Sequence, residues 1–345
     1  MASLFRRFWP ALLAAAGTFA SQTYKPAAIT QANLGLEYAK KANYTAAIEA
    51  YRRAVAIDPN LPNIYLNLGL AYFKSGKFRE AIAAFDQENA HAPSDRVATL
   101  LGMSYYGLGQ YKEAISRLQP AATAQPDNNE LAYLVAKCYL LSAQYSEALD
   151  AFERLLKRDP DSPAVHVLLG QTLDVYGRTQ EAAGEYEAAA QRAPTMPDVH
   201  FSLAYLYARL KRYDDAEREY QQELKNDPQH ALSCAYLGDL AIKTNKPDEA
   251  EKYLKKAAAL DPKLRIAHFD LGVLYANAGR DAAAIPELKQ AVRLDPSEYN
   301  AHYRLARIYQ NMGKTAEAKA EFAIVQKLHE KKDEVPLLQV KPPEK

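Results

Sequence analysis

The sequence lacks the short motifs that carry most enzyme chemistry. Its 345 residues contain no Gly-rich phosphate-binding loop, no Gly-x-Ser-x-Gly and no His-Glu-x-x-His. Those patterns are typical of nucleotide binding, serine hydrolysis and zinc proteolysis. Aspartate and glutamate are plentiful, but they fall on the polar faces of amphipathic segments, where solvation accounts for them. We therefore expect neither a catalytic site nor a bound cofactor.

Net charge and long apolar runs are missing as well. The formal net charge is +1, and removing residues 1–20 takes away Arg6 and Arg7 and leaves −1. A nearly neutral chain has no electrostatic footprint for nucleic acid, so no nucleic-acid partner is expected. The longest apolar stretch, Phe8 to Ala20, has 13 residues. A bilayer-spanning helix needs about 20, so no stable membrane span is expected.

What the sequence does contain is a unit that returns at a fixed spacing. A proline ends the unit eight times, at intervals of 34 residues with one interval of 33: Pro59, Pro93, Pro126, Pro160, Pro194, Pro228, Pro262 and Pro296. Counting back from each proline gives repeats that begin at Ala28, Pro62, Asp95, Asn129, Pro163, Pro197, Ala231 and Arg265. A ninth repeat begins at Tyr299 and has Glu330 where the proline would fall.

Within this frame, each unit predicts two antiparallel helices, A and B, joined by a tight turn. The eighth residue is glycine or alanine in every repeat, and the twentieth is always alanine. Small residues at these two points let helix A and helix B approach closely. The eleventh residue is tyrosine in seven repeats. The A–B turns carry Gly76, Gly109, Gly177, Asn245, Gly279 and Gly313, which tolerate left-handed backbone.

This pattern resembles the tetratricopeptide repeat family, from Ala28 to Lys332. The resemblance implies an all-α fold, a right-handed superhelical solenoid of antiparallel helix pairs. Residues 1–20 have the basic, apolar and small-residue order of a secretory signal peptide, which predicts an exported, periplasmic or extracellular protein. The alternative is an N-terminal extension on a cytoplasmic protein. Residues 21–27 are expected to form a short lead-in, and residues 333–345 an extended, proline-containing tail.

Histidine and cysteine recur in ways that invite a metal or disulfide interpretation. His166, His200, His268 and His302 are each the fourth residue of a repeat. Neighbouring repeats lie about 8–10 Å apart, whereas zinc needs its ligand nitrogens at about 2 Å, so we interpret these histidines as packing residues. Cys138 and Cys234 are three repeats apart, too far for a disulfide, and are expected to be buried free thiols.

The family resemblance also implies where a partner binds. In this family the A helices line the concave side, and the second, fifth, sixth, ninth, twelfth and thirteenth residues of each repeat project from it. The predicted partner-binding groove therefore holds Asn67, Leu70, Phe73, Lys74, Arg96, Met103, Tyr106, Tyr133, Lys137, Gln171, Asp174, Phe201, Tyr205, Arg209, Tyr236, Asp239, Phe269, Asp270, Tyr303, Arg304 and Arg307. Aromatic rings provide contact area and the polar groups provide orientation. The alternative is that some of these rings pack against the adjacent A helix.

One familiar use of this groove is not expected here. A subgroup of the family grips a peptide's C-terminal carboxylate with lysine, asparagine and arginine from three successive repeats. Asn67 fits the middle position and Arg96 loosely replaces a lysine, but Ala32, Leu36 and Leu100 stand where polar residues are needed. We therefore do not predict binding of a C-terminal tail by this clamp.

The sequence as a whole predicts a non-enzymatic scaffold that binds a protein or an extended peptide in the concave groove. The alternative is a structural subunit of a cell-envelope or secretion assembly, which would make its contacts through the outer B-helix faces. A less favoured possibility is an accessory subunit of a separate enzyme. The sequence does not define the partner or the oligomeric state.

The N-terminal segment gives the first testable prediction. If residues 1–20 are a signal peptide, the mature protein begins close to Ser21. N-terminal sequencing of the protein purified from its native host checks this. Recovery of a cytosolic protein that begins at Met1 or Ala2 would contradict both the cleavage and the export.

Overall fold

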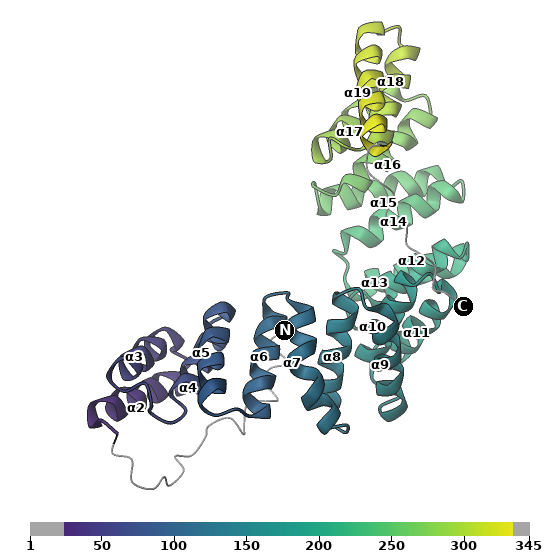
Figure 1. Cartoon of the computed structure of the whole chain (residues 1–345). Helices are drawn as coiled ribbons and strands as arrows, with labels where there is room; N and C mark the ends of the chain where they lie inside the picture. Colours follow the sequence, from purple (N-terminus) through teal and green to yellow (C-terminus); the bar gives the residue numbers. More distant parts are fainter. Residues whose placement is uncertain (1–23, 334–345) are drawn as a thin grey trace. The chain divides into compact units, whose positions relative to one another are not determined.

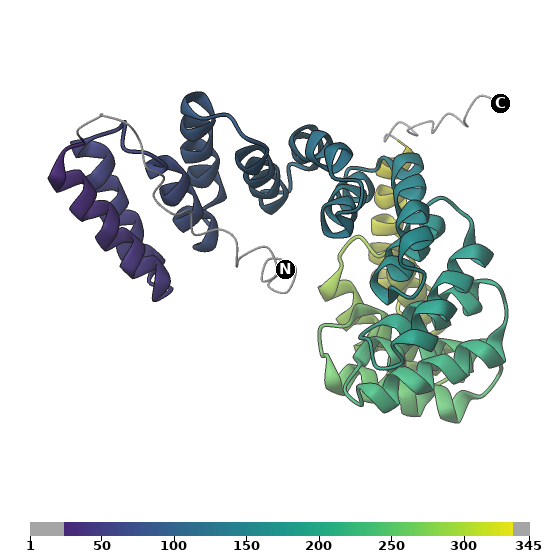
Figure 2. The ribbon, with the colours of Figure 1, turned by 90° about the horizontal axis from the view of Figure 1, so that it is seen from below.

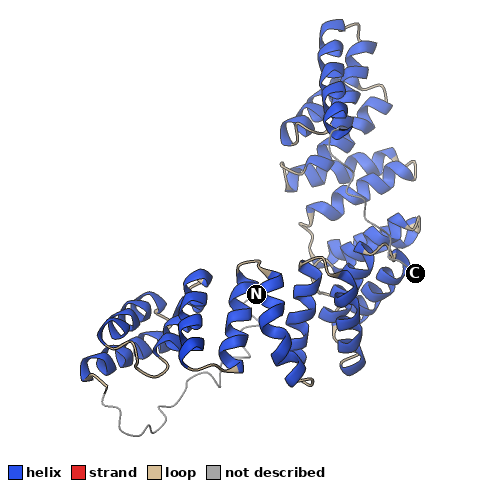
Figure 3. Cartoon of the chain, in the orientation of Figure 1, coloured by secondary structure: helices blue, strands red, loops and turns tan. Residues whose placement is uncertain are grey.

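A computed structural model describes residues 24–333, and in this range the chain forms eighteen α-helices and no strand (Figures 1 and 3). Odd and even repeats alike consist of one A helix followed by one B helix. The helices are α2 (Pro26–Lys40), α3 (Tyr44–Ile57), α4 (Ile64–Lys74), α5 (Phe78–His91), α6 (Asp95–Gly107), α7 (Tyr111–Ala124), α8 (Asn129–Leu141), α9 (Tyr145–Arg158), α10 (Pro163–Val175), α11 (Thr179–Arg192), α12 (Val199–Arg209), α13 (Tyr213–Asn226), α14 (Ala231–Lys243), α15 (Pro247–Leu260), α16 (Arg265–Asn277), α17 (Asp281–Leu294), α18 (Tyr299–Asn311) and α19 (Thr315–Asp333). The predicted all-α array of helix pairs is confirmed.

The chain divides into two compact units, with the boundary between Arg178 and Thr179. The boundary falls in the turn of the fifth repeat, so α10 belongs to the first unit and α11 to the second. Within each unit the two helices of a repeat pack on each other, and each B helix packs on the next A helix. The first pair, α2 and α3, lies side by side in both views (Figures 1 and 2).

Several predicted segments lie wholly or largely outside the described residues. These are the signal peptide (1–20), residues 21–23 of the lead-in and the tail beyond Asp333. The described part of the lead-in already enters the first helix, because α2 begins at Pro26, where proline is favoured in the first helical turn. Among residues 24–333, every helix is too short or too polar to cross a membrane.

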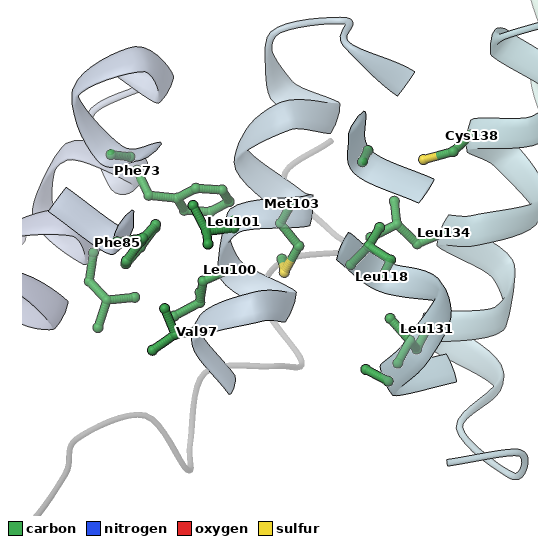
Figure 4. Close-up of a cluster of buried hydrophobic side chains, with 14 of the residues drawn as sticks. Phe73, Phe85, Val97, Leu100, Leu101, Met103, Leu118, Leu131, Leu134 and Cys138 are labelled. Carbon is green, nitrogen blue, oxygen red and sulfur yellow. The ribbon is translucent and has the colours of Figure 1, made fainter. Parts of the chain in front are cut away.

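Close approach of helices A and B forms the core of each repeat. A Cβ atom added at Gly69 on α4 would lie 2.5 Å from Cε1 of Phe85 on α5, so the ring occupies the space that a side chain would need. Ala81, also on α5, is completely buried. Figure 4 shows the continuation of this core through α6, α7 and α8, where Leu101 and Leu118 are completely buried. The predicted roles of the eighth and twentieth residues in this repeat are confirmed.

The turns between helices explain two recurrent sequence features, the glycines between helices A and B and the Asp-Pro pairs after helix B. Gly76, Gly109, Gly177, Gly279 and Gly313 have φ between 70° and 82°, and Asn245 has φ 57°, as predicted. Three repeats place ordinary residues in the same left-handed position, Ala42, Ala143 and Lys211. In the Asp-Pro turns after helix B, the carboxylates of Asp58, Asp227, Asp261 and Asp295 accept the backbone N–H two residues further on, which closes a local turn.

Repeats two and six start their A helices later than the others. Asn63 and Asp198 precede α4 and α12 with left-handed backbone, and each of these helices has only 11 residues. In both repeats, a buried glutamate of helix B accepts a hydrogen bond from a backbone N–H near the start of the shortened A helix. Glu88 accepts the Leu66 N–H at 3.1 Å, and Glu223 accepts the Phe201 N–H at 3.2 Å. The repeat pattern alone does not predict that these glutamates are buried and cap a helix.

The A–B contact gives a stability prediction with a control two residues away on the same helix. Ala81→Leu inserts three carbons where the twentieth residue has no free space, and should lower the free energy of unfolding by about 1–3 kcal/mol. Ala83 is exposed, so Ala83→Leu should change it by less than about 0.5 kcal/mol. Denaturant unfolding measures both, and amide hydrogen exchange should locate the loss in repeats one to three. Equal effects of the two leucines would contradict the packing account.

Candidate partner-binding surface

We use the name A-helix surface for the predicted groove positions that remain accessible in the structure. Three predicted residues of the first unit do not belong to it. Leu70 and Phe73 of α4 are each 7% exposed, and Met103 of α6 is 5% exposed. All three lie in the hydrophobic core, and Figure 4 labels Phe73 and Met103 there. The Phe73 ring meets the edge of Phe78 with ring centres 5.5 Å apart. For these three the structure favours the packing alternative over presentation to a partner.

The other predicted groove residues of the first unit are partly buried, except Gln171, which is exposed. Only some of them lie close together. Tyr106 of α6 meets α8, where the Lys137 amino group lies 5.9 Å from the Tyr106 ring centre. Burial raises the pKa of Tyr133, while the charge of Lys137 lowers it. Arg96 lies within electrostatic reach of Glu88. Asn67 is partly buried on α4. Tyr106, Tyr133 and Lys137 therefore form one small mixed patch.

The second unit brings its predicted residues together more fully. Tyr205 of α12 meets Tyr236 of α14 edge to face, with ring centres 5.7 Å apart, and Phe201 meets Tyr236 at 5.5 Å. The Arg209 guanidinium lies 5.7 Å from the Tyr205 ring centre. Tyr205 remains 37% exposed. These rings pack on the neighbouring A helix, as the packing alternative predicts, and Tyr205 also keeps part of its surface accessible.

Beneath these rings lies a tyrosine of the B helix, the twenty-fourth residue of its repeat. Tyr220 of α13 is completely buried, and its ring stacks on Tyr236 at 5.9 Å. Its hydroxyl is buried without a hydrogen-bond partner. Burial, followed by the charges of Tyr236, Asp239 and Tyr205, raises the pKa of Tyr220. Its hydroxyl is therefore within electrostatic reach of the groups that line the A-helix surface.

Two carboxylates continue this part of the surface toward α16. Asp239 of α14 binds Lys243 at 2.6 Å. Asp270 of α16 has a buried Oδ2 atom with no hydrogen-bond partner. Burial raises the pKa of Asp270 to about 7, and the charge of Asp239 adds to the effect, while Lys243 and Arg265 oppose it. An incompletely satisfied carboxylate at this depth is costly and calls for an explanation.

At the end of the second unit, three predicted residues line one pocket. Tyr303, Arg304 and Arg307 of α18 face a hollow of about 520 Å³. Its other lining residues come from α16, α17 and α18: Ala276, Asn277, Asp281, Tyr299, Asn300, Ile308 and Asn311. Two arginines and three asparagines make this pocket rich in hydrogen-bond donors, in contrast to the carboxylates around Asp270. Phe269, also predicted, is partly buried against the hydrophobic core of the second unit.

The recurrent histidines serve the packing role predicted for them. His200 Nδ1 lies 2.6 Å from Glu219, and its Nε2 lies 2.9 Å from the Pro194 carbonyl. His268 and His302 repeat the arrangement with Glu287 and Glu321, and each histidine ties the preceding proline turn to its own repeat. In the part of the chain that the structure describes, no group of three or more His, Cys, Asp or Glu is placed to hold a metal ion. Cys138 and Cys234 are buried free thiols, as predicted.

The B helices present a different kind of surface. In the first unit, α7, α8 and α9 enclose a hollow of about 370 Å³ that contains none of the predicted groove residues. In the second unit, Glu187 of α11 accepts a hydrogen bond from the Tyr207 hydroxyl of α12 at 2.6 Å. A residue of helix B such as Glu187 would be expected on the outer face, but Glu187 takes part in packing between repeats.

Stacked two-helix repeats with an accessible A-helix surface define a helical-repeat scaffold. One family model described as a tetratricopeptide repeat matches residues 105–172 and 275–335. A second model with the same description matches residues 167–231 and 237–299. A third, described as a TPR repeat, matches residues 35–76. The chain belongs to the tetratricopeptide repeat family. A search of curated proteins by sequence gave no match.

Solved structures with the same fold cover most of the chain. The C-terminal part of a repeat-containing protein from Cytophaga hutchinsonii aligns with a TM-score of 0.58 at 18% identity, over 69% of this chain and 98% of that one. A tetratricopeptide repeat protein from Parabacteroides merdae gives 0.53 at 16% identity, over 72% and 99%. A chain of the APC/C hetero-tetramer Cut9–Hcn1 gives 0.53 at 15% identity, over 87% and 73%. At these identities the likeness concerns the fold.

The buried carboxylate of Asp270 gives a pH-dependent stability prediction. Because its pKa is higher in the folded chain than its ordinary value of 3.8, its contribution to stability is full below pH 3.8 and is lost as the pH rises through about 7. Asp270→Asn should therefore raise the free energy of unfolding at pH 8 by about 1–3 kcal/mol, with little change near pH 4. Urea unfolding at the two pH values measures this. Asp248→Asn, at an exposed position of α15, is the control, and an equal gain there would contradict the burial account.

Proposed function

We propose that this protein is a non-enzymatic scaffold that binds an extended segment of a partner protein along the A-helix surface of its second unit. Tetratricopeptide repeats are protein-interaction modules, and the family is typically non-catalytic. The observation that carries the proposal is the line of accessible aromatic and charged residues from α12 to α18. Tyr205 and Tyr303 are 37% and 41% exposed, large rings that the core does not need to bury.

The chemistry along this surface suits a peptide better than a small molecule. Tyr205 and Tyr236 provide apolar area with hydroxyl groups, the combination that is enriched at protein interfaces. Carboxylates follow on α14 and α16, and donor-rich side chains follow on α18. Each A helix thus offers the next part of a ligand a different partner, and an extended chain can satisfy them in sequence.

The first unit contributes less to this proposal. Leu70, Phe73 and Met103 are core residues, so the accessible part of its predicted groove is limited to smaller patches such as Tyr106, Tyr133 and Lys137. Residues 1–20 have the basic, apolar and small-residue regions of a signal peptide in order. This pattern supports a further proposal, that binding takes place outside the cytoplasm.

Peptide selection tests the proposed function. A randomised dodecapeptide display library is selected against the protein, and fluorescence polarisation measures the affinity of the enriched peptides. Tyr205→Ala should weaken binding about tenfold or more, because truncating a central aromatic anchor typically costs about 2 kcal/mol. Helical content should not change.

The matched control is Lys252→Glu on α15, an exposed residue on a B helix, which should leave the affinity within about twofold. If Lys252→Glu abolishes binding and Tyr205→Ala does not, the A-helix surface is not the binding site. The structural-subunit alternative, with contacts through the B helices, would then replace the proposal.

A further inference from the structure

Between α12 and α16, two polar groups lack a hydrogen-bond partner. The Asp270 Oδ2 atom and the Tyr220 hydroxyl are both buried without a partner. A carboxylate can only accept hydrogen bonds when ionised. Lys243 is the one amino group that the structure places on these carboxylates, and it binds Asp239. Arg265 pairs with Glu298 of the next turn.

The two carboxylates act on one another and on the tyrosines beside them. The charges of Tyr205, Asp239 and Asp270, after burial, raise the pKa of Tyr236, so all four groups lie within electrostatic reach. When both are ionised, Asp239 and Asp270 carry two negative charges. Of the two basic residues that act on Asp270, Lys243 binds Asp239 and Arg265 pairs with Glu298. The site is therefore acidic, and its repulsion is relieved by any positive charge that enters.

The surroundings are also suited to a cation that carries an apolar stem. Tyr205 and Tyr236 stand edge to face at 5.7 Å, and aromatic faces and hydroxyls attract guanidinium and ammonium groups. The Arg209 guanidinium, 5.7 Å from the Tyr205 ring centre, is an internal example of such a contact. The aromatic walls can cover the methylene groups of a long basic side chain, while its head reaches the carboxylates.

From this arrangement we infer that Tyr205, Tyr236, Asp239 and Asp270 form a subsite for a lysine or arginine side chain of the bound peptide. The inference rests on the proposed function, since it places one residue of the partner on the A-helix surface. The head group donates hydrogen bonds to the carboxylates of Asp270 and Asp239. An arginine fits best, because its planar fork has five donors for the acceptors that converge here.

The charges of Asp239 and Asp270 disfavour a carboxylate or phosphate ligand at this position, because a third negative charge would be placed beside two. An anionic group of the partner has a separate location in the pocket of Arg304 and Arg307. The acidic subsite thus predicts a partner with a basic residue on the side of α14.

The test uses the full-length protein and the display-selected dodecapeptides. Enriched sequences should share one arginine or lysine. Replacing that arginine with citrulline, which keeps the shape and removes the charge, should weaken binding at least about tenfold, as expected for hydrogen bonds to charged groups. Asp270→Asn should weaken binding of the arginine peptide to a similar extent, and the citrulline peptide should then lose little more.

Misfolding does not account for such a loss, because Asp270→Asn is expected to be more stable than the parent protein at pH 8. The matched control is Asp248→Asn, which removes an exposed carboxylate on α15 and should leave both affinities unchanged. Equal binding of the arginine and citrulline peptides overturns the inference, as does enrichment of peptides without a basic residue.

These outcomes separate the inference from the proposed function. If Tyr205→Ala abolishes binding while citrulline and Asp270→Asn have no effect, the surface binds peptides but the acidic subsite is wrong. If binding of the selected peptides is unaffected by Tyr205→Ala and lost in Lys252→Glu, the proposed function fails and the inference fails with it.

Discussion

The structure depends on the contact between the two helices of each repeat. Small residues at the eighth and twentieth positions allow an aromatic or branched side chain of helix B to lie directly against helix A, as Phe85 does at Gly69. Within each compact unit, this distance lets successive A helices present their accessible side chains on one surface. The site then needs no loops or insertions, because side chains from successive A helices meet at a fixed spacing. Tyr205 and Tyr236 illustrate this on α12 and α14.

Periodic positions of the sequence were sufficient to predict the fold. Prolines, small residues and turn glycines fix helix order and pairing because each acts locally, within one repeat. The late starts of α4 and α12 escaped prediction because they depend on Asn63 and Asp198 adopting left-handed backbone and on a glutamate that is 25 residues further along the chain. The division at Arg178 also has no signature in the repeat pattern.

The sequence predicts which face of each A helix carries the site, but not which residues of that face are buried. Leu70 and Phe73 occupy the same positions in their repeats as accessible residues elsewhere, yet the neighbouring helices cover them. Frame position says which way a residue points, and the size of the side chains around it decides whether it is reached by solvent. The lack of a hydrogen-bond partner for Asp270 Oδ2 arises in the same way, from the particular residues that surround it on α14 and α16. No pattern within one helix encodes such a combination.

The buried glutamates of repeats two and six have a consequence for how such arrays can change. Pro62 and Pro197 begin these repeats, and Glu88 and Glu223 end up as the acceptors for the delayed helices, whereas the other repeats have alanine, leucine or valine at the glutamate position. A first half taken from repeat two and joined to a second half from repeat eight would leave the Leu66 N–H without its acceptor. The two halves are therefore not interchangeable parts. Recombination of this chain can exchange whole repeats, but a crossover inside repeats two or six separates two features that must be inherited together.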